Sequence, residues 1–317
     1  MPLKGFSTIF ESTFSNDLQD GIVEYFDWEL LNKGNYFNVS LGETVDGKDY
    51  SRLKPSTSDN FVAGKAWEGF RKNWVWQSGV AYNPSPIVGS NPSKPGISGV
   101  YINDVFYSSS TTGTYSHYID YYNGRVVFNS PIPTGSKVQA AHSYKWITTD
   151  YAAAVPWLRE IQSKTITPGD FTTNKDQWNL PADLKIQLPF IGVEIVPTRS
   201  FEGYQLGGGQ WIRSDVIFHC LAEDEITRDK LIDIVSFQND GTFYLLNNNQ
   251  IFQNNDFPLD YRGMPVSGAK TYPLLSSVYN GGKIRFINTS VSNLTSYNSN
   301  IYGGIVRTTA EGVKLNI

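Results

Sequence analysis

The spacing of apolar residues predicts one helix near the start of the chain and a compact α/β unit in its second half. Leu18, Ile22 and Phe26 recur every four residues within 16–31, which places them on one face of a helix. The run 36–41 then has the composition of a strand. Between 188 and 246 the pattern predicts two strands, a helix and a third strand, which we expect at 190–196, 215–221, 226–237 and 242–246. We expect the rest of the chain to be organised around this unit.

Local signals set the expected limits of these elements. Pro197 should end the first strand, because proline removes a backbone donor. The second strand is apolar on both faces apart from His219, as in a strand that is covered on both sides. Asp224 or Thr227 can cap the helix, and Gly241 suits a left-handed residue after it. Loop signals follow at 247–250 and 254–256, and strands at 283–287, 302–308 and 313–317 flank a Ser/Asn/Thr-rich turn region.

Residues 99–148 form the clearest β region. Turn pairs at Asn103-Asp104 and Asn123-Gly124 each separate two short β-prone runs, which predicts two hairpins, the second with a type I′ turn. A Pro/Gly turn at 131–136 then leads into a long final strand at 137–146. The pattern is typical of a meander or a small sandwich of about six strands.

Together these elements predict an α+β fold that is mainly β. It would comprise an N-terminal helix, a central antiparallel β meander or sandwich, and a C-terminal α/β unit. Prolines and glycines interrupt the chain at 78–98, which predicts a linker or an ordered arm there. The expected organisation is a helical and aromatic region at 1–77, the linker at 78–98, the β module at 99–148, and an α/β domain with C-terminal strands at 149–317.

A group of aromatic residues in the N-terminal region has two interpretations. Trp67, Phe70, Trp74 and Trp76 follow one another at close to helical spacing. They can pack the N-terminal helix against the next domain, or they can form an exposed platform on which a sugar or a base stacks. Packing is favoured, because a carbohydrate site also needs convergent polar partners that the sequence does not identify. Trp67, Trp74 and Trp76 remain candidate interaction residues.

A glycine triplet is the second candidate interaction site. Gly207, Gly208 and Gly209 are followed by Gln210 and Trp211 rather than by the Gly-Lys-Ser/Thr of a phosphate-binding loop. The triplet therefore predicts a hairpin tip, or alternatively a place where the backbone of a partner approaches closely. Trp211 would belong to the same surface.

Composition narrows the classes of function. Of 317 residues only 18% are charged while 14% are aromatic, and the net charge of −4 comes with no basic block, so we expect no nucleic-acid site. The single cysteine, Cys220, excludes an intrachain disulfide and lies in an apolar run, where a buried inert thiol is expected. The N-terminus has no apolar core of a signal peptide, and no segment approaches the ~20 apolar residues of a membrane span.

The residue types that carry catalysis form no recognisable motif. His117, His142 and His219 are far apart in the sequence, and no metal-ligand spacing accompanies them, so we expect neither a metal nor a cofactor. The acidic run 223–225 is explained by its position at a helix start. A pair of carboxylates for glycoside hydrolysis remains open if Asp120 or Asp150 meets another acid in a cleft.

Several phrases of the sequence resemble bacteriophage proteins. YIDYYNGRVVF at 118–128, followed by Pro131, Pro133, Gly135-Ser136 and Ser143-Tyr144-Lys145, resembles a β module of tailed-phage tail and structural proteins. LLNKGNYFNV at 30–39, WVWQSGV at 74–80 and GYQLGGGQW at 203–211 resemble a family of virion structural proteins in large contractile-tailed phages of the marine cyanophage type. The unit at 188–246 is also similar in element order to tail-terminator and neck-ring folds.

The resemblance implies a non-enzymatic virion structural protein, a neck, connector or tail-terminator component at the head–tail junction. Such a protein would form a homo-oligomeric ring, or dock on one, and would contact the portal or connector, the tail tube or the sheath. It would reside in the virion after assembly in the host cytoplasm. The alternative is a receptor- or glycan-binding tail appendage or baseplate protein that uses the tryptophan patch, and a polysaccharide-degrading tail enzyme is a third possibility.

Overall fold

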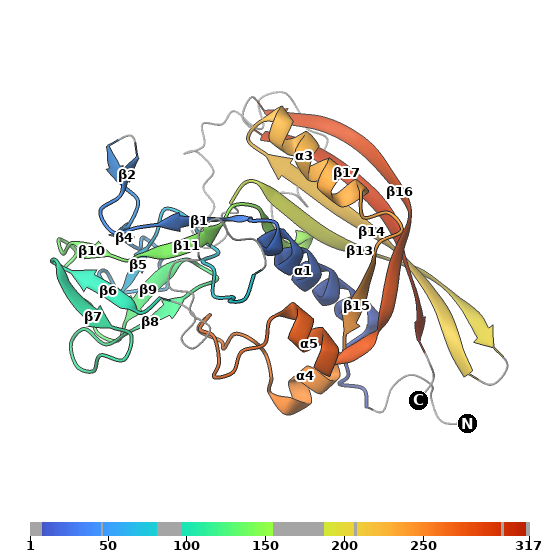
Figure 1. Cartoon of the computed structure of the whole chain (residues 1–317), viewed down its shortest axis with the longest axis horizontal. Helices are drawn as coiled ribbons and strands as arrows, with labels where there is room; N and C mark the ends of the chain where they lie inside the picture. Colours follow the sequence, from blue (N-terminus) through green and yellow to red (C-terminus); the bar gives the residue numbers. More distant parts are fainter. Residues whose placement is uncertain are drawn as a thin grey trace.

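Strands dominate the computed structural model, which describes residues 8–45, 47–80, 97–154, 187–205, 208–298 and 301–314. Strand residues make up 42% of it and helical residues 19%, so the predicted α+β, mainly β class is confirmed. Figure 1 shows two lobes, one built only from short strands and one in which helices pack on a long-stranded sheet.

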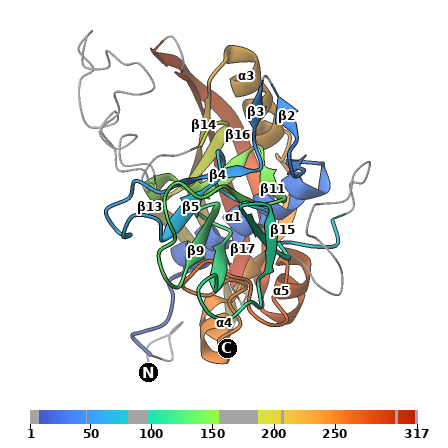
Figure 2. The ribbon, with the colours of Figure 1, turned by 90° about the vertical axis from the view of Figure 1, so that its left-hand side faces the viewer.

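The first lobe is a curled, fully antiparallel sheet with the strand order β7-β6-β10-β4-β5-β9-β8. This lobe faces the viewer in Figure 2. Its strands are β4 (Arg52–Pro55), β5 (Ala66–Glu68), β6 (Gly99–Ile102), β7 (Val105–Ser108), β8 (His117–Asp120), β9 (Arg125–Phe128) and β10 (Val138–Gln139). Two smaller antiparallel pairs join it, β1 (Tyr36–Val39) with β11 (His142–Lys145), and β2 (Thr44–Val45) with β3 (Lys48–Asp49). Large side chains fill the curl, with Trp67, Trp74 and Phe128 fully buried at its centre.

One of the two predicted turns has the expected form. Asn103 and Asp104 both adopt positive φ (49° and 67°) between β6 and β7, as a type I′ hairpin requires. Between β8 and β9 the prediction of a two-residue turn is wrong, because the connection spans 121–124 and only Gly124 has positive φ. The cause is Asp120, whose carboxylate accepts hydrogen bonds from the backbone and side-chain nitrogens of Asn123 (3.0 and 2.8 Å) and so winds the loop around itself.

The predicted long strand at 137–146 is two strands with different partners. β10 pairs with β4 and β6 inside the curled sheet, whereas β11 pairs with β1. The chain changes partner at Ala140, whose N–H donates to the carbonyl of Ser51 (3.0 Å). The run looks like one continuous strand in the sequence, but its two parts pair in different sheets.

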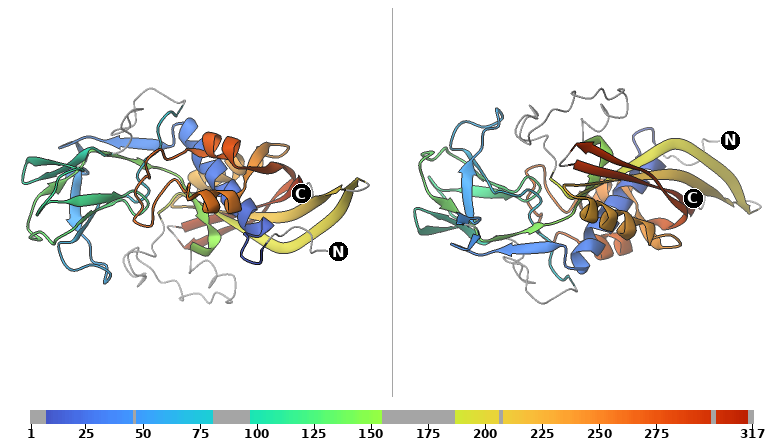
Figure 3. Two further views of the ribbon diagram at one scale, coloured as in Figure 1. Left: turned by 90° about the horizontal axis from the view of Figure 1, so that it is seen from below. Right: turned by 90° about the horizontal axis from the view of Figure 1, so that it is seen from above.

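The second lobe is a six-stranded sheet in the order β12-β13-β14-β17-β16-β15. Its strands are β12 (Thr148–Tyr151), β13 (Phe190–Gln205), β14 (Gly208–Ala222), β15 (Thr242–Leu246), β16 (Asn280–Asn298) and β17 (Ile301–Lys314), and a 3₁₀ turn η1 (Ala152–Ala154) follows β12. Every neighbouring pair is antiparallel except β12 with β13, which run parallel. β17 pairs with β14 as far as Gln210, and the tip of the β13–β14 hairpin projects beyond it (Figure 3).

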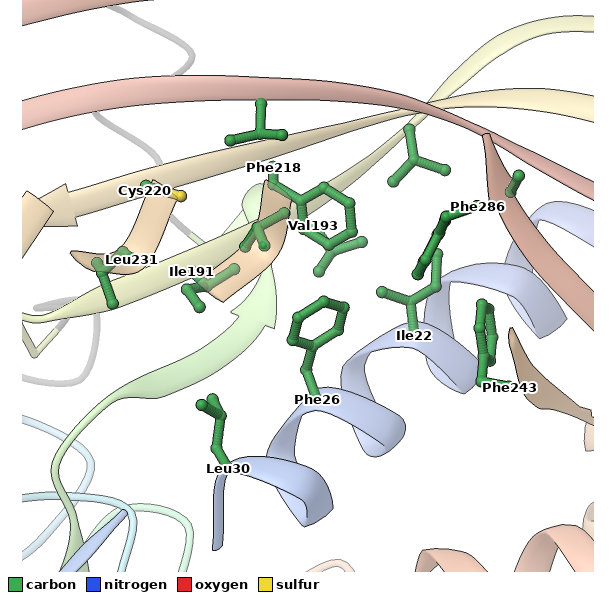
Figure 4. Packing of buried hydrophobic residues seen from close by; sticks show 14 of the residues in the cluster. Ile22, Phe26, Leu30, Ile191, Val193, Phe218, Cys220, Leu231, Phe243 and Phe286 are labelled. Carbon is green, nitrogen blue, oxygen red and sulfur yellow. The ribbon is translucent and has the colours of Figure 1, made fainter. Parts of the chain in front are cut away.

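Two helices cover one face of this sheet. α1 (Phe14–Asn32) and α3 (Glu225–Ser236) contribute their apolar stripes to a single core with every second residue of the central strands (Figure 4). Ile22 and Phe26 of α1 lie over Phe218 of β14, and Leu231 of α3 belongs to the same cluster. The predicted helices at 16–31 and 226–237 are therefore confirmed, and their period of 3.6 residues is the reason that they were readable.

Two short helices lie at the end of the sheet beside β15. α4 (Asn248–Asn254) and α5 (Tyr272–Val278) pack through Ile251 and Leu275 against Trp28 and Leu246. The prediction of loop at 247–250 is wrong, because Asn247 accepts from the N–H of Gln250 and starts α4 as its cap. Asparagine favours both turns and helix N-termini, so the sequence could not separate the two.

The strands of the second lobe are longer than predicted. Pro197 does not end β13. It lies in a bulge between Ile195 and Arg199, where the ladder does not require its N–H group. The Ser/Asn/Thr-rich region at 288–298 is part of β16, again with bulges rather than a turn. Beyond α3, the left-handed residue is Asp240 (φ 65°) and not Gly241.

The predicted boundary at residue 77 does not separate structural units. Residues 14–32 form α1 and belong to the core of the second lobe, whereas β4 and β5 pair within the first lobe. Most of the predicted linker, 81–96, lies outside the described residues, as do 155–186 of the predicted α/β domain and 315–317 of the last predicted strand.

The cap of α3 supports a test of the sequence interpretation. Asp224 accepts from the N–H of Thr227 (2.8 Å), so the predicted cap is confirmed. We expect Asp224→Ala to lower the free energy of unfolding by about 1 kcal/mol, because an orphan N–H loses its acceptor. Urea denaturation followed by circular dichroism measures this. Asp233→Ala, an exposed acid within the same helix, is the matched control, and an equal loss in both variants would contradict the capping role.

Candidate functional site

The three candidate tryptophans are buried in the first lobe. Trp67 and Trp74 are each 1% exposed and Trp76 is 8% exposed. The indole N–H groups of Trp67 and Trp74 donate to the carbonyls of Gly64 and Arg71 (3.0 Å each). A stacking platform needs exposed ring faces, so these residues pack the core and form no glycan surface. Their near-helical spacing was misleading, since Trp67 lies in β5 and Trp74 bridges to Tyr144 of β11.

The glycine candidates lie at the tip of the β13–β14 hairpin. Gly207 is outside the described residues, and Gly208 and Gly209 begin β14, with Gln205 opposite Gly208. Trp211 contacts the ring of Tyr204 edge-on, with 5.6 Å between ring centres. Tyr204 is 42% exposed and Phe201 55% exposed, so the projecting half of this hairpin carries aromatic side chains at the surface.

The histidines and the cysteine have structural surroundings. His142 stacks on Trp74 (4.4 Å between ring centres), and its burial lowers its pKa to about 4. His219 lies 2.7 Å from a carboxylate oxygen of Glu194 on the neighbouring strand. Burial raises the pKa of Cys220 to about 12, which leaves it an inert thiol. Within the described residues, no group of three or more His, Cys, Asp or Glu side chains is placed to hold a metal ion.

A cluster of acids lies where α1 meets β11 and β12. Asp20, Glu24 and Asp27 recur on one side of α1, so their side chains line up along the helix. Asp20 accepts from the hydroxyl of Tyr151 (2.6 Å) and from the amide of Asn248 (2.5 Å). At the other end of the row, the ammonium of Lys145 lies 2.7 Å from Asp27. The acidic side of α1 is therefore held by side chains of β11, β12 and α4.

Glu24 lies at the middle of the row, and its pKa is raised well above the ordinary value. Burial raises its pKa to about 7, the charge of Asp27 raises it further, and Lys145 opposes the shift. Asp150 of β12 contributes to the same field, and burial raises its own pKa as well. The sequence signal for this cluster was the spacing of three acids on α1, which is also the spacing of an ordinary solvated helix face.

The carboxylates that the sequence left open are both engaged by donors. Asp120 forms an ion pair with Arg125 (2.8 Å) in addition to its bonds with Asn123. Asp150 accepts from the hydroxyl of Tyr122 and from the backbone of Tyr151. Asp150 lies near the α1 acids, whereas Asp120 lines a different feature, a cleft on the first lobe.

We call this feature the junction cleft, because it lies between two segments that are distant in the sequence. It has a volume of about 360 Å³ and two walls. One wall is the β8–β9 hairpin, with Tyr118, Tyr122 and Asn123, and the other is the loop 259–263 that arrives from the second half of the chain. Gly263 joins the walls: its carbonyl accepts from the N–H of Tyr121 (3.1 Å), its φ is 78°, and a Cβ there would lie 2.4 Å from Asp120 Oδ1. Only glycine fits this approach.

The six-stranded sheet leaves part of each outer edge without a strand neighbour in the described residues. β12 pairs with β13 only along Phe190–Val193, so β13 is open on that side from Glu194 onward. β15 pairs with β16 only as far as Arg285, and the loop before β15 adds bonds at Phe286 and Thr289, so β16 is open from Ser290 to Asn298. Open edges expose backbone donors and acceptors that another strand can use.

The direction of the backbone groups on these edges follows from the register. Thr148 N–H donates to the carbonyl of Pro189, so odd-numbered residues of β13 face outward, and the pairing of Arg199 with Ser214 keeps this alternation beyond the bulge. On β16, Phe286 faces outward through its bonds with residues 240–241, and the one-residue bulge before Ser290 turns Val291 outward. The N–H groups of Phe201 and Val291 therefore point away from the sheet.

In the part of the chain that the structure describes, no helix is both long enough and apolar enough to cross a membrane. No protein-family model matches this chain, and no characterised protein matches its sequence.

Proposed function

We propose that this chain is a non-enzymatic structural protein that assembles head to tail through the two open edges of its six-stranded sheet. The observation that carries the proposal is the pair of unpaired strand segments, Arg199–Gln205 of β13 and Ser290–Asn298 of β16, on opposite sides of one sheet. Addition of a strand to an exposed edge is a common mode of protein association, because main-chain hydrogen bonds supply the contact.

The two edges are compatible in direction. β13, β14, β17 and β16 are successive antiparallel neighbours, so β13 and β16 run in opposite directions within one sheet. A second copy that continues the sheet in the same orientation therefore places its β16 antiparallel to β13 of the first. The contact joins two different surfaces and is heterologous, so it can propagate from copy to copy.

The geometry of the sheet favours a curved product. Each open segment lies at the distal end of its strand, so neighbouring copies must be staggered along the strands, as strands are in a closed barrel. The twist between adjacent strands, roughly −20 to −25° on average, adds a rotation at every contact. A heterologous contact with a constant rotation closes into a ring when the rotation divides a full turn, and otherwise gives a helical filament.

Ring formation agrees with what the sequence resemblance implies. We propose that the assembly is part of a contractile-tailed bacteriophage virion, as a neck, connector or tail-terminator component whose neighbours are the portal or connector, the tail tube or the sheath. The projecting aromatic hairpin, with exposed Phe201 and Tyr204, supports a role in contacts with other proteins.

The first test is the mass of the chain in solution. Light scattering after size exclusion should give a defined multiple of 35.5 kDa, and negative-stain images of the same peak should show closed rings of one symmetry. A chain that stays at 35.5 kDa at every concentration would contradict self-assembly. A two-fold dimer without larger species would contradict the head-to-tail mode.

A further inference from the structure

We propose that the junction cleft binds a neutral carbohydrate, with Tyr261 and Arg262 as its principal contacts. This inference does not rest on the assembly proposal, and it concerns a surface of the other lobe. Carbohydrate binding through the tryptophans is excluded by their burial, whereas the cleft has exposed aromatic rings together with polar groups. Aromatic rings and a few placed polar groups are the usual lining of a small-ligand site.

One guanidinium lies beside two aromatic rings of the cleft. Tyr261 is 95% exposed, and the guanidinium carbon of Arg262 lies 5.5 Å from its ring centre. The same guanidinium lies 5.4 Å from the ring centre of Tyr118 on the opposite wall. Arg262 thus holds one ring on each side of the cleft in place. A ring face that is held open to solvent suits the apolar C–H face of a sugar.

The charge of the cleft selects a neutral ligand. Its two acids and two bases form two ion pairs, Asp120 with Arg125 (2.8 Å) and Asp260 with Arg262 (2.9 Å), so their formal charges cancel. Asp260 also accepts from the backbone N–H groups of Arg262 and Met264 (2.9 and 3.0 Å), which fixes it on that side. An anionic ligand would have to displace Asp260 from the guanidinium. A sugar hydroxyl can bond to the rim of either ion pair without breaking it.

The engagement of the backbone argues against an extended peptide as the ligand. The carbonyl of Gly263 is bonded to Tyr121, and the N–H of Asp260 to the carbonyl of Met264 (2.8 Å). A peptide bound in extended form needs free main-chain groups along one edge. A volume of about 360 Å³ lies near the lower end of the range for ligand pockets, ~300–1,000 Å³, and fits the terminal sugar of a glycan.

The experiment uses the full-length chain on an array of immobilised neutral and sialylated glycans. Each bound glycan is then titrated in solution and its contacts are mapped by saturation-transfer NMR. We expect binding to neutral glycans, and we expect Tyr261→Ala to weaken it about tenfold or more, because the stacking face is lost. Phe237→Ala is the matched control, since it removes another largely exposed ring (80% exposed) on the other lobe and should bind as the native chain does.

The remaining outcomes are decisive in the same experiment. Absence of binding to every glycan, binding to sialylated glycans only, or unchanged binding by Tyr261→Ala would each overturn the inference. Phe201→Pro, which alters only the sheet edge, should keep the affinity per site, so a failure of ring assembly is distinguishable from a failure of the cleft.

Discussion

Phe201→Pro and Val291→Pro should each convert the assembled chain into monomers. The N–H group of each residue faces an open edge of the sheet, so proline removes an outward donor and leaves the bonds inside the sheet in place. Proline is tolerated on edge strands for that reason, and both chains should fold normally. Light scattering after size exclusion would show the mass fall to 35.5 kDa in each variant.

An equimolar mixture of the two variants distinguishes the head-to-tail mode from its alternatives. The Phe201→Pro chain keeps its β16 edge, and the Val291→Pro chain keeps its β13 edge. One productive contact remains possible, so the mixture should form a heterodimer of about twice the chain mass and nothing larger. If β13 instead paired with β13 of another copy, Val291→Pro alone would still dimerise, and the mixture would contain no heterodimer.

The matched controls for these variants separate the backbone from the side chain. Phe201→Ala and Val291→Ala remove the same exposed side chains but keep the N–H groups. Assembly by the alanine variants together with monomeric proline variants would assign the contact to main-chain hydrogen bonds. Rings formed by either proline variant would refute the edge contact.

Glu24→Gln should be more stable than the native chain at high pH, and this advantage should shrink as the pH falls. The pKa of Glu24 is about 7 in the folded state and ordinarily 4.5, so the folded state holds its proton more tightly than the unfolded state does. The contribution of this group to stability is present below pH 4.5 and is lost as the pH rises through 7. The difference between the two pKa values corresponds to about 3 kcal/mol. Urea denaturation of both chains at pH 4 to 8 should therefore show the advantage of the glutamine variant grow by about that amount.

Glu29→Gln provides the control, because Glu29 lies on the same helix but outside the row of acids that faces Lys145. Measuring both variants over the same pH range isolates the effect that belongs to the row of acids. A constant difference for Glu24→Gln would mean that Glu24 is solvated in the folded chain. That result would contradict the effect of the Asp27 charge on the pKa of Glu24.

Periodic elements were predictable from the sequence, and elements that depend on distant partners were not. The stripe Leu18, Ile22 and Phe26 identified α1 because helical period and burial coincide there. The extent of β13 was missed because Pro197 is permitted by an edge bulge, and no property of proline itself reveals that its N–H position is unneeded. The split of 137–146 between two sheets was invisible for a similar reason, since local residue preferences carry no information about the partner strand.

The candidate site was less predictable than the fold. The tryptophans were conspicuous in the sequence, but burial decides whether an aromatic ring packs or binds, and burial depends on the whole fold. The junction cleft joins Tyr118 to Tyr261 and Arg262, which are more than a hundred residues away, and its walls meet through the backbone of Gly263. A glycine between Arg262 and Met264 gives no signal of such a contact without the tertiary structure.

Two hydrogen bonds between Asn35 and Ile147 mark the first lobe as an insertion in the second lobe. The Asn35 side chain bonds both backbone groups of Ile147 (2.7 and 2.8 Å), and beside it Tyr36 of β1 pairs with Lys145 of β11. The segment 36–145 therefore leaves and rejoins the second lobe at one point, as inserted domains do. The helix α1 precedes the insertion, and the strands that α1 covers follow the insertion. During synthesis, more than a hundred residues are therefore added after α1 before its partner strands are made. The first lobe can close in that interval, and closing it brings the two parts of the interrupted lobe together.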